Sequence, residues 1–172
     1  MSTRSRRTSV VILAAGLVAL AVAIAGCGGS GGSGGDGGAY GAARAPAPSS
    51  GGKASVKLAS TKLGSVLVDA KGRTLYLFEA DKGPMSACSG ACASVWPPLT
   101  STGKPTAGPG VAASKLGTTK RSDGATEVTY NGHPLYTYAG DSAPGQTSGQ
   151  GLDDYGAEWY ALSAAGSKID NG

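Results

Sequence analysis

The sequence has little of what catalytic and redox sites need, because its 172 residues include one histidine and three cysteines. A serine–histidine–aspartate triad would have to use His133 as its base, and no serine near it is marked as a nucleophile. A haem attachment motif would need a histidine after its second cysteine, but Ala93 follows Cys92. We therefore predict that the protein is not an enzyme and carries no haem.

The sequence also lacks an apolar run long enough to cross a membrane. The longest run, Val10 to Ala25, has 16 residues. As a helix it would reach about 24 Å, short of a hydrocarbon core of roughly 30 Å. Three arginines precede this run, and the small residues Gly26 and Cys27 follow it. This order is typical of a secretory signal, so we predict a leader over residues 1–26.

The end of the leader indicates a lipid anchor. Ile24-Ala25-Gly26-Cys27 resembles the bacterial lipobox, in which the cysteine sulfur receives a diacylglycerol and becomes the mature N-terminus. We therefore predict that acylated Cys27 holds the protein to membrane lipid on the extracytoplasmic face, since two or more acyl chains anchor a protein stably. Arg6-Arg7 also suggests twin-arginine export, but Ser9 stands where that motif prefers an apolar residue, which favours general secretion.

Charge gives no sign of a nucleic-acid partner. The formal net charge is +4, and loss of the three leader arginines leaves twelve basic against eleven acidic residues. No stripe of lysine and arginine is interleaved with aromatic residues. Nucleic acid is therefore excluded as a partner, and a protein or small-molecule partner stays open.

Composition divides the mature chain into a tether and one domain. Residues 27–54 are mostly glycine, serine, alanine and proline, and they cannot bury enough apolar surface to offset the entropy of ordering. We predict a disordered tether there. Residues 55–172 hold nearly all the aromatic residues and are enough for one hydrophobic core. This segment is expected to form a single β-rich domain.

The domain contains an internal repeat. Gly72–Asp81 returns as Gly132–Asp141, with glycine, leucine, tyrosine, a second aromatic residue and aspartate in the same register. Trp96 and Leu99 also return, as Trp159 and Leu162, once three extra residues are allowed. We therefore predict a mainly β fold of two pseudo-equivalent, hairpin-containing repeats, at about 63–99 and 124–165.

Turn and strand signals predict the secondary structure of these repeats. We expect one hairpin from 65–69 and 74–78 around Gly72, and a second from 127–130 and 133–138 around Asn131-Gly132. Pro134 should lie at a sheet edge because it cannot donate to a ladder. The remaining expectations are strands at 116–122 and 159–163, a helical turn or tight loop within 87–95, a connector at 100–110 and a mobile glycine-rich connector at 145–151.

These motifs resemble a known family. Tyr76–Asp81 and Tyr136–Asp141 both match the pattern Y-x-[FWY]-x-x-D. This pattern names a family of bacterial lipoproteins that is also called the secreted repeat of unknown function. The segments around Cys88–Cys92, Trp96–Leu99 and Trp159-Tyr160 are similar to its other blocks. The resemblance implies a surface lipoprotein and indicates no substrate.

The two cysteines outside the lipobox allow two interpretations. Outside the cytoplasm, Cys88 and Cys92 are expected to form a disulfide, because positions four apart share one face of a helical turn. The alternative is a copper-binding or thiol-redox site for electron transfer, in which Met85 and His133 join the two thiolates, since sulfur and imidazole suit copper. Apart from this alternative we predict no cofactor and no metal.

The repeated motif residues allow a catalytic and a structural interpretation. Asp81 and Asp141 could be general acids, or calcium ligands together with Asp153, Asp154 and Glu158. We interpret them as structural, accepting hydrogen bonds from backbone N–H groups or tyrosine hydroxyls, because scaffolding is duplicated more readily than an active site. The aromatic residues of the motif blocks are expected to form the core; they are Tyr76, Phe78, Trp96, Tyr136, Tyr138 and Trp159. The sequence thus predicts a non-enzymatic binding or envelope module.

Overall fold

The computed structural model describes residues 52–170, which form a mainly β domain. The predicted leader, the predicted acylation site Cys27 and nearly all of the predicted tether lie outside the described residues. Within residues 52–170, no helix is both long and apolar enough to span a membrane.

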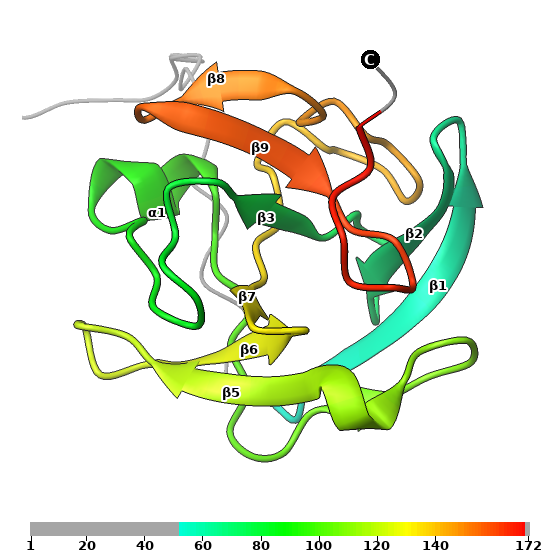
Figure 1. Cartoon of the computed structure of the whole chain (residues 1–172), viewed down its shortest axis with the longest axis horizontal. Helices are drawn as coiled ribbons and strands as arrows, with labels where there is room; N and C mark the ends of the chain where they lie inside the picture. The colour runs from blue at the N-terminus through cyan, green and yellow to red at the C-terminus, as the bar shows by residue number, and fades with distance from the viewer. Residues whose placement is uncertain (1–51, 171–172) are drawn as a thin grey trace, which may run out of the picture. The chain divides into compact units, whose positions relative to one another are not determined.

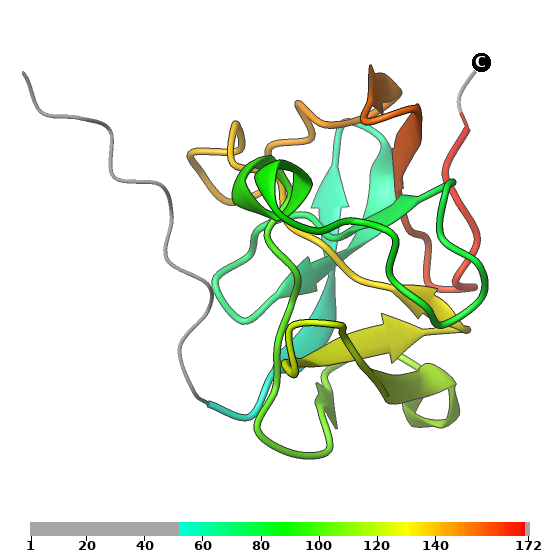
Figure 2. The same ribbon diagram turned by 90° about the vertical axis from the view of Figure 1, so that its left-hand side faces the viewer.

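Short strands and two short helices follow one another along the chain. They are β1 (Ser55–Thr61), β2 (Gly64–Asp69), β3 (Tyr76–Phe78), α1 (Ala91–Val95), β4 (Thr106–Ala107), a 3-10 helix (Ala113–Lys115), β5 (Leu116–Lys120), β6 (Thr126–Tyr130), β7 (His133–Pro134), β8 (Leu152–Asp154) and β9 (Ala157–Ala161). Three small sheets result, with strand orders β2-β1-β4, β3-β9-β8 and β5-β6-β7. Figures 1 and 2 show the β1–β2 hairpin and α1 on opposite sides of the domain.

Both predicted turns are present, and each is built around a glycine in the left-handed region. Gly72 has φ 82°, and the Asn131-Gly132 pair has φ 51° and 84°, as a type I′ turn requires. The Asn131-Gly132 turn connects β6 to β7, an edge strand that ends at Pro134, as proline at an edge predicts. The predicted strand over 133–138 is too long: Leu135 still donates its N–H to the carbonyl of Val128 in β6, but the next residue, Tyr136, pairs with Tyr76 instead.

The two repeats exchange their closing segments. β3 of repeat one pairs with β9 of repeat two, and Leu162 bonds with Leu75 of repeat one. In the same way Leu99 of repeat one donates its N–H to the carbonyl of Leu135 in repeat two, over 2.8 Å. Tyr76 and Tyr136 link the halves directly, since each donates its backbone N–H to the other's carbonyl, at 2.8 and 3.0 Å. Neither repeat is therefore complete without the other.

Six aromatic side chains form the centre of this exchanged structure. The rings of Trp96 and Trp159 stack with their centroids 4.0 Å apart and 4° between their planes. Phe78 stacks on the outer side of Trp159 at 4.0 Å, and Tyr138 packs on Trp96 at 4.4 Å. The rings of Tyr76 and Tyr136 meet Trp96 and Trp159, respectively, edge to face. Equivalent residues of the two repeats thus occupy equivalent places; five of the six side chains are buried, and Tyr138 is half-buried against them.

Other elements depart from the predictions. β1, the parallel strand β4 inside the predicted connector, and β8 were not expected. The glycine-rich segment 145–151 was predicted as a mobile connector, but part of it is packed into the core. Gly149 is buried and donates its N–H to the hydroxyl of Tyr76 over 3.3 Å, and Thr147 is 3% exposed.

The packing of Gly149 yields a stability prediction. A Cβ added at this position would lie 2.7 Å from Cη2 of Trp96 and 3.0 Å from Cζ of Tyr76. Gly149→Ala should therefore lower the free energy of unfolding by about 2 kcal/mol, as overpacking of a core does. Urea unfolding followed by tryptophan fluorescence measures this change. Gly103→Ala is the matched control, because its Cβ would meet nothing within 4 Å; equal effects of the two substitutions would contradict the prediction.

Candidate functional site

The motif tyrosines and aspartates pair across the two repeats. The hydroxyl of Tyr76 donates to Oδ2 of Asp141 over 2.6 Å, and the hydroxyl of Tyr136 donates to Oδ2 of Asp81 over 2.9 Å. Burial raises the pKa of both tyrosines, so that their hydroxyls stay protonated and act as donors. Each motif is therefore completed by the acid of the other repeat.

The second oxygen of each motif aspartate fixes the loop that follows it. Oδ1 of Asp81 accepts the backbone N–H of Ala87 at 2.7 Å, and Oδ1 of Asp141 accepts that of Ser148 at 2.8 Å. Both oxygens of Asp81 and of Asp141 therefore accept hydrogen bonds from a tyrosine hydroxyl or a backbone N–H group. These are the contacts that the structural interpretation of the two aspartates expects. The three other acidic candidates lie on the β8–β9 hairpin, where Asp153 faces Glu158 and Asp154 faces Ala157.

The predicted disulfide is present between Cys88 and Cys92, whose Cα atoms are 5.3 Å apart. Both cysteines are buried, and Cys92 belongs to α1, the predicted helical turn. Met85 is 70% exposed in the preceding loop. A disulfide leaves no thiolate to bind copper, and within residues 52–170 no group of three or more histidine, cysteine or acidic side chains is arranged to hold a metal. The copper alternative stays an untested prediction.

A buried ion pair that the sequence analysis missed lies beside the Tyr136–Asp81 pair. Nη1 of Arg121 is 2.8 Å from Oε2 of Glu127, and these two side chains are 2% and 0% exposed. Arg121 also donates to the carbonyl of Cys88 at 2.6 Å and to the hydroxyl of Ser86 at 2.7 Å. The pair thus ties β6 of repeat two to the disulfide loop of repeat one. Oε1 of Glu127 is buried and has no hydrogen-bond partner.

Burial governs the protonation of the acids in this cluster. It raises the pKa of Glu127 from 4.5 to about 7, and that of Asp81 from 3.8 to about 6, although Arg121 acts in the opposite direction on both. A comparison of the repeats could have identified Glu127. Leu67 donates its N–H to the carbonyl of Leu162, and Val128 donates its N–H to that of Leu99, the equivalent leucine of the other repeat. Leu67 and Val128 are therefore equivalent, and the residues before them, Val66 and Glu127, correspond as well.

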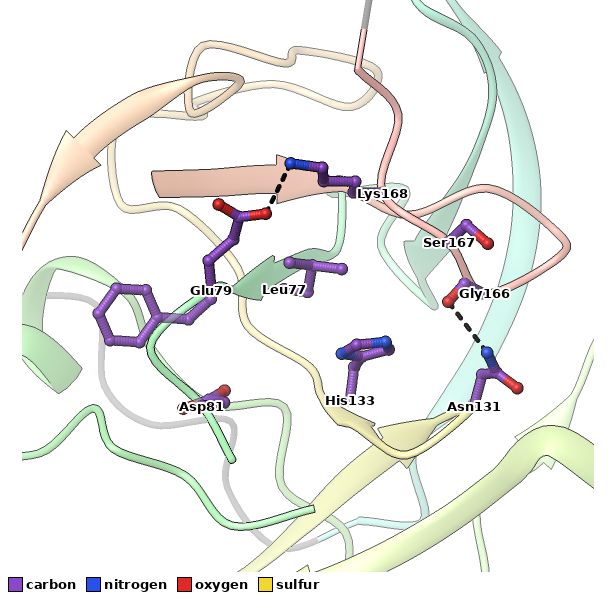
Figure 3. Close-up of a pocket in the computed structure, with 9 residues that line it drawn as sticks. Leu77, Glu79, Asp81, Asn131, His133, Gly166, Ser167 and Lys168 are labelled. Carbon is purple, nitrogen blue, oxygen red and sulfur yellow. Dashed lines mark hydrogen bonds and ion pairs between the residues drawn. The ribbon is translucent and has the colours of Figure 1, made fainter. Parts of the chain in front are cut away.

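His133 lies in a different place, a cavity of about 580 Å³ that opens beside β3. Figure 3 shows its ring rising from β7 toward Leu77 and Glu79. Nζ of Lys168 bonds Oε1 of Glu79 over 2.6 Å at one wall, and Asn131 donates to the carbonyl of Gly166 at another. Of the site residues predicted from the sequence, Phe78, Asp81 and His133 line this cavity; Met85 and the two cysteines do not.

The comparisons with known proteins agree with the repeat. The model of a family described as a secreted repeat of unknown function matches the chain twice, over residues 57–100 and 117–163. The chain belongs to this family. The predicted membership in this secreted repeat family is therefore confirmed, and the family indicates a location outside the cytoplasm. No curated protein and no solved structure matches the chain.

For this secreted repeat protein, the buried acid predicts a pH dependence of stability. The pKa of Glu127 is about 7 in the folded state, above its ordinary 4.5, so the folded protein binds more protons than the unfolded one between these values. Stability from this group should be fully present below pH 4.5 and fall by about 3 kcal/mol in all as the pH rises through 7, of which about 2 kcal/mol is lost between pH 5 and pH 8. Urea unfolding at pH 5 and pH 8 measures this loss.

Glu127→Gln should remove most of this loss, because the amide carbonyl can still accept from Arg121 but does not ionise. Asp153→Asn, at an exposed position of β8, is the matched control and should retain the wild-type pH dependence. If Glu127→Gln instead follows the wild-type curve between pH 5 and 8, Glu127 is already ionised in the folded protein at pH 5 and the prediction is wrong.

Proposed function

We propose that the protein is a lipid-anchored, extracytoplasmic module that binds a ligand or protein partner without catalysing a reaction. The observation that carries this proposal is the exchange of the tyrosine–aspartate pairs between the repeats. In this arrangement the tyrosines and aspartates of the repeated motif bond to one another inside the domain. Both carboxylates accept hydrogen bonds from a tyrosine hydroxyl and a backbone N–H group. The motif then serves as a frame, and the surface around it is available for recognition.

The cavity beside His133 is the recognition site that we propose. Its volume of about 580 Å³ lies within the range of small-molecule sites, which are commonly 300–1,000 Å³. Leu77 gives it an apolar side chain, while His133 and the Lys168–Glu79 ion pair give it donors and acceptors. A ligand or peptide side chain with an apolar body and a polar group fits this combination.

Anchoring through Cys27 is tested by one substitution. Cys27→Ser removes the sulfur that would carry the diacylglycerol, so the protein should move from the membrane fraction into the culture medium. Immunoblots of the two fractions, with the wild-type chain beside the variant, measure this shift. Cys88→Ser is the control for loss of a cysteine elsewhere and should stay with the membrane. Retention of the Cys27→Ser protein on the membrane would refute lipidation.

Binding at the cavity is tested on the anchored protein in intact cells. A photo-reactive benzoylphenylalanine placed at position 133 should give light-dependent adducts that mass spectrometry detects, because this side chain rises into the cavity. The same residue at position 120, an exposed site on β5, is the control. Adducts at 133 and not at 120 support recognition at the cavity. No adduct at 133, or equal labelling at both positions, would contradict it.

A further inference from the structure

A group of cations surrounds a small cavity at the first residues of the domain. Lys53, Lys71 and Arg73 line this cavity of about 190 Å³, which lies between the start of β1 and the Gly72 turn. Lys57 reaches its wall, since its Nζ is 3.5 Å from the carbonyl oxygen of Ala70, another lining residue. We refer to Lys53, Lys57, Lys71 and Arg73 as the basic cluster.

The acidic residue beside the basic cluster is already paired with one of its cations. Asp69 is the one acidic residue that lines the cavity, and it is 4% exposed. Its Oδ2 lies 2.7 Å from Nη2 of Arg73, and its Oδ1 accepts the backbone N–H groups of Lys71 and Arg73 at 2.9 Å. The lysine charges around the cavity therefore have no acidic partner among its lining residues, and the side chains of Lys53 and Lys71 are exposed.

Negative charge gathers at another part of the domain. Asp153, Asp154 and Glu158 belong to the β8–β9 hairpin, which lies at the opposite end of the view in Figure 1 from the start of β1. An acidic hairpin at the end opposite the basic cluster favours an orientation at a negative surface in which the cluster faces that surface.

The basic cluster is also the part of the domain closest in sequence to the predicted anchor. Lys53 follows Cys27 by 26 residues. A glycine-rich chain of that length has a root-mean-square span of roughly 30 Å. A domain held by such a chain would meet the membrane surface frequently, and the residues next to the chain would meet it first.

We propose that the basic cluster binds the anionic phosphate headgroups of the membrane to which the protein is anchored. The orientation of the domain, with the cluster toward the membrane, rests on the proposed lipid anchor. The headgroup site itself depends only on the lysines of the cluster. Each lysine near an anionic leaflet strengthens attachment about fivefold. Bound in this way, the domain turns its β8–β9 hairpin away from the lipid.

The test uses the mature chain from residue 28 without its acyl group, so that attachment cannot come from the anchor. It is sedimented with vesicles of phosphatidylglycerol and phosphatidylcholine, and with vesicles of phosphatidylcholine alone. We expect binding to the anionic vesicles only. The triple variant Lys53→Gln/Lys57→Gln/Lys71→Gln should bind them at least about tenfold more weakly.

The matched control is Lys62→Gln/Lys82→Gln/Lys120→Gln, which removes the same charge from three exposed lysines outside the cluster. It should bind within about twofold of wild type. Equal loss in both variants, or no binding to anionic vesicles, overturns the proposal. Binding of inorganic phosphate at the cluster, without binding to the anionic vesicles, would assign the cluster to free phosphate and overturn the lipid assignment. Because no acyl group is present, failure here leaves the Cys27→Ser result independent.

Discussion

The structure depends on the stacking of Trp96 against Trp159, one tryptophan from each repeat, with their ring centroids 4.0 Å apart. Both indoles are fully buried, and each is flanked by an aromatic residue that closes the stack. They are the largest fully buried side chains of residues 52–170, and buried aromatic residues of this size dominate the energetics of a small core. Because each repeat supplies half of the stack, neither repeat can bury its own tryptophan alone.

The exchange of strands and of tyrosine–aspartate pairs follows from this shared centre. Once the indoles stack, β9 lies against β3, and the segment around Leu99 lies against repeat two. The hydroxyls of Tyr76 and Tyr136 then reach the acids of the opposite repeat. The residues that recur in the sequence are used for this frame, which explains why the repeat itself indicates no chemistry. Individual features come from positions at which the repeats differ, such as His133 of repeat two and Arg73, the residue at the same position of repeat one.

The sequence could predict local structure because the determinants are local. The Gly72 and Asn131-Gly132 turns were predicted correctly, since their geometry depends on adjacent residues. The pairing of closing segments could not be predicted. Leu75 and Leu135 are chemically identical partners for Leu99, so the choice depends on loops whose course is set by the whole fold.

The candidate site was only partly predictable for a related reason. Charged side chains are normally exposed, so the strand pattern by itself does not mark Glu127 as buried, and the signal is its correspondence with the buried Val66 of repeat one. The cavity around His133 draws its walls from β3, the β6–β7 turn and the segment 166–168, which are far apart in the chain. The cysteine pair was predictable because the two residues are only four apart in the sequence, although Cys88 precedes α1 and only Cys92 lies in the helix.

The buried pair of Arg121 and Glu127 makes the contact between the two repeats asymmetric. Arg121 of repeat two donates hydrogen bonds to the Cys88 carbonyl and the Ser86 hydroxyl of repeat one, at 2.6 and 2.7 Å. Two copies of repeat two, brought together in the same way, would keep the Arg121–Glu127 ion pair but leave these buried donors without those partners, and an unsatisfied buried donor is costly. Two copies of repeat one would lack the arginine altogether. The asymmetry therefore favours pairing of unlike repeats, the arrangement that a single chain provides.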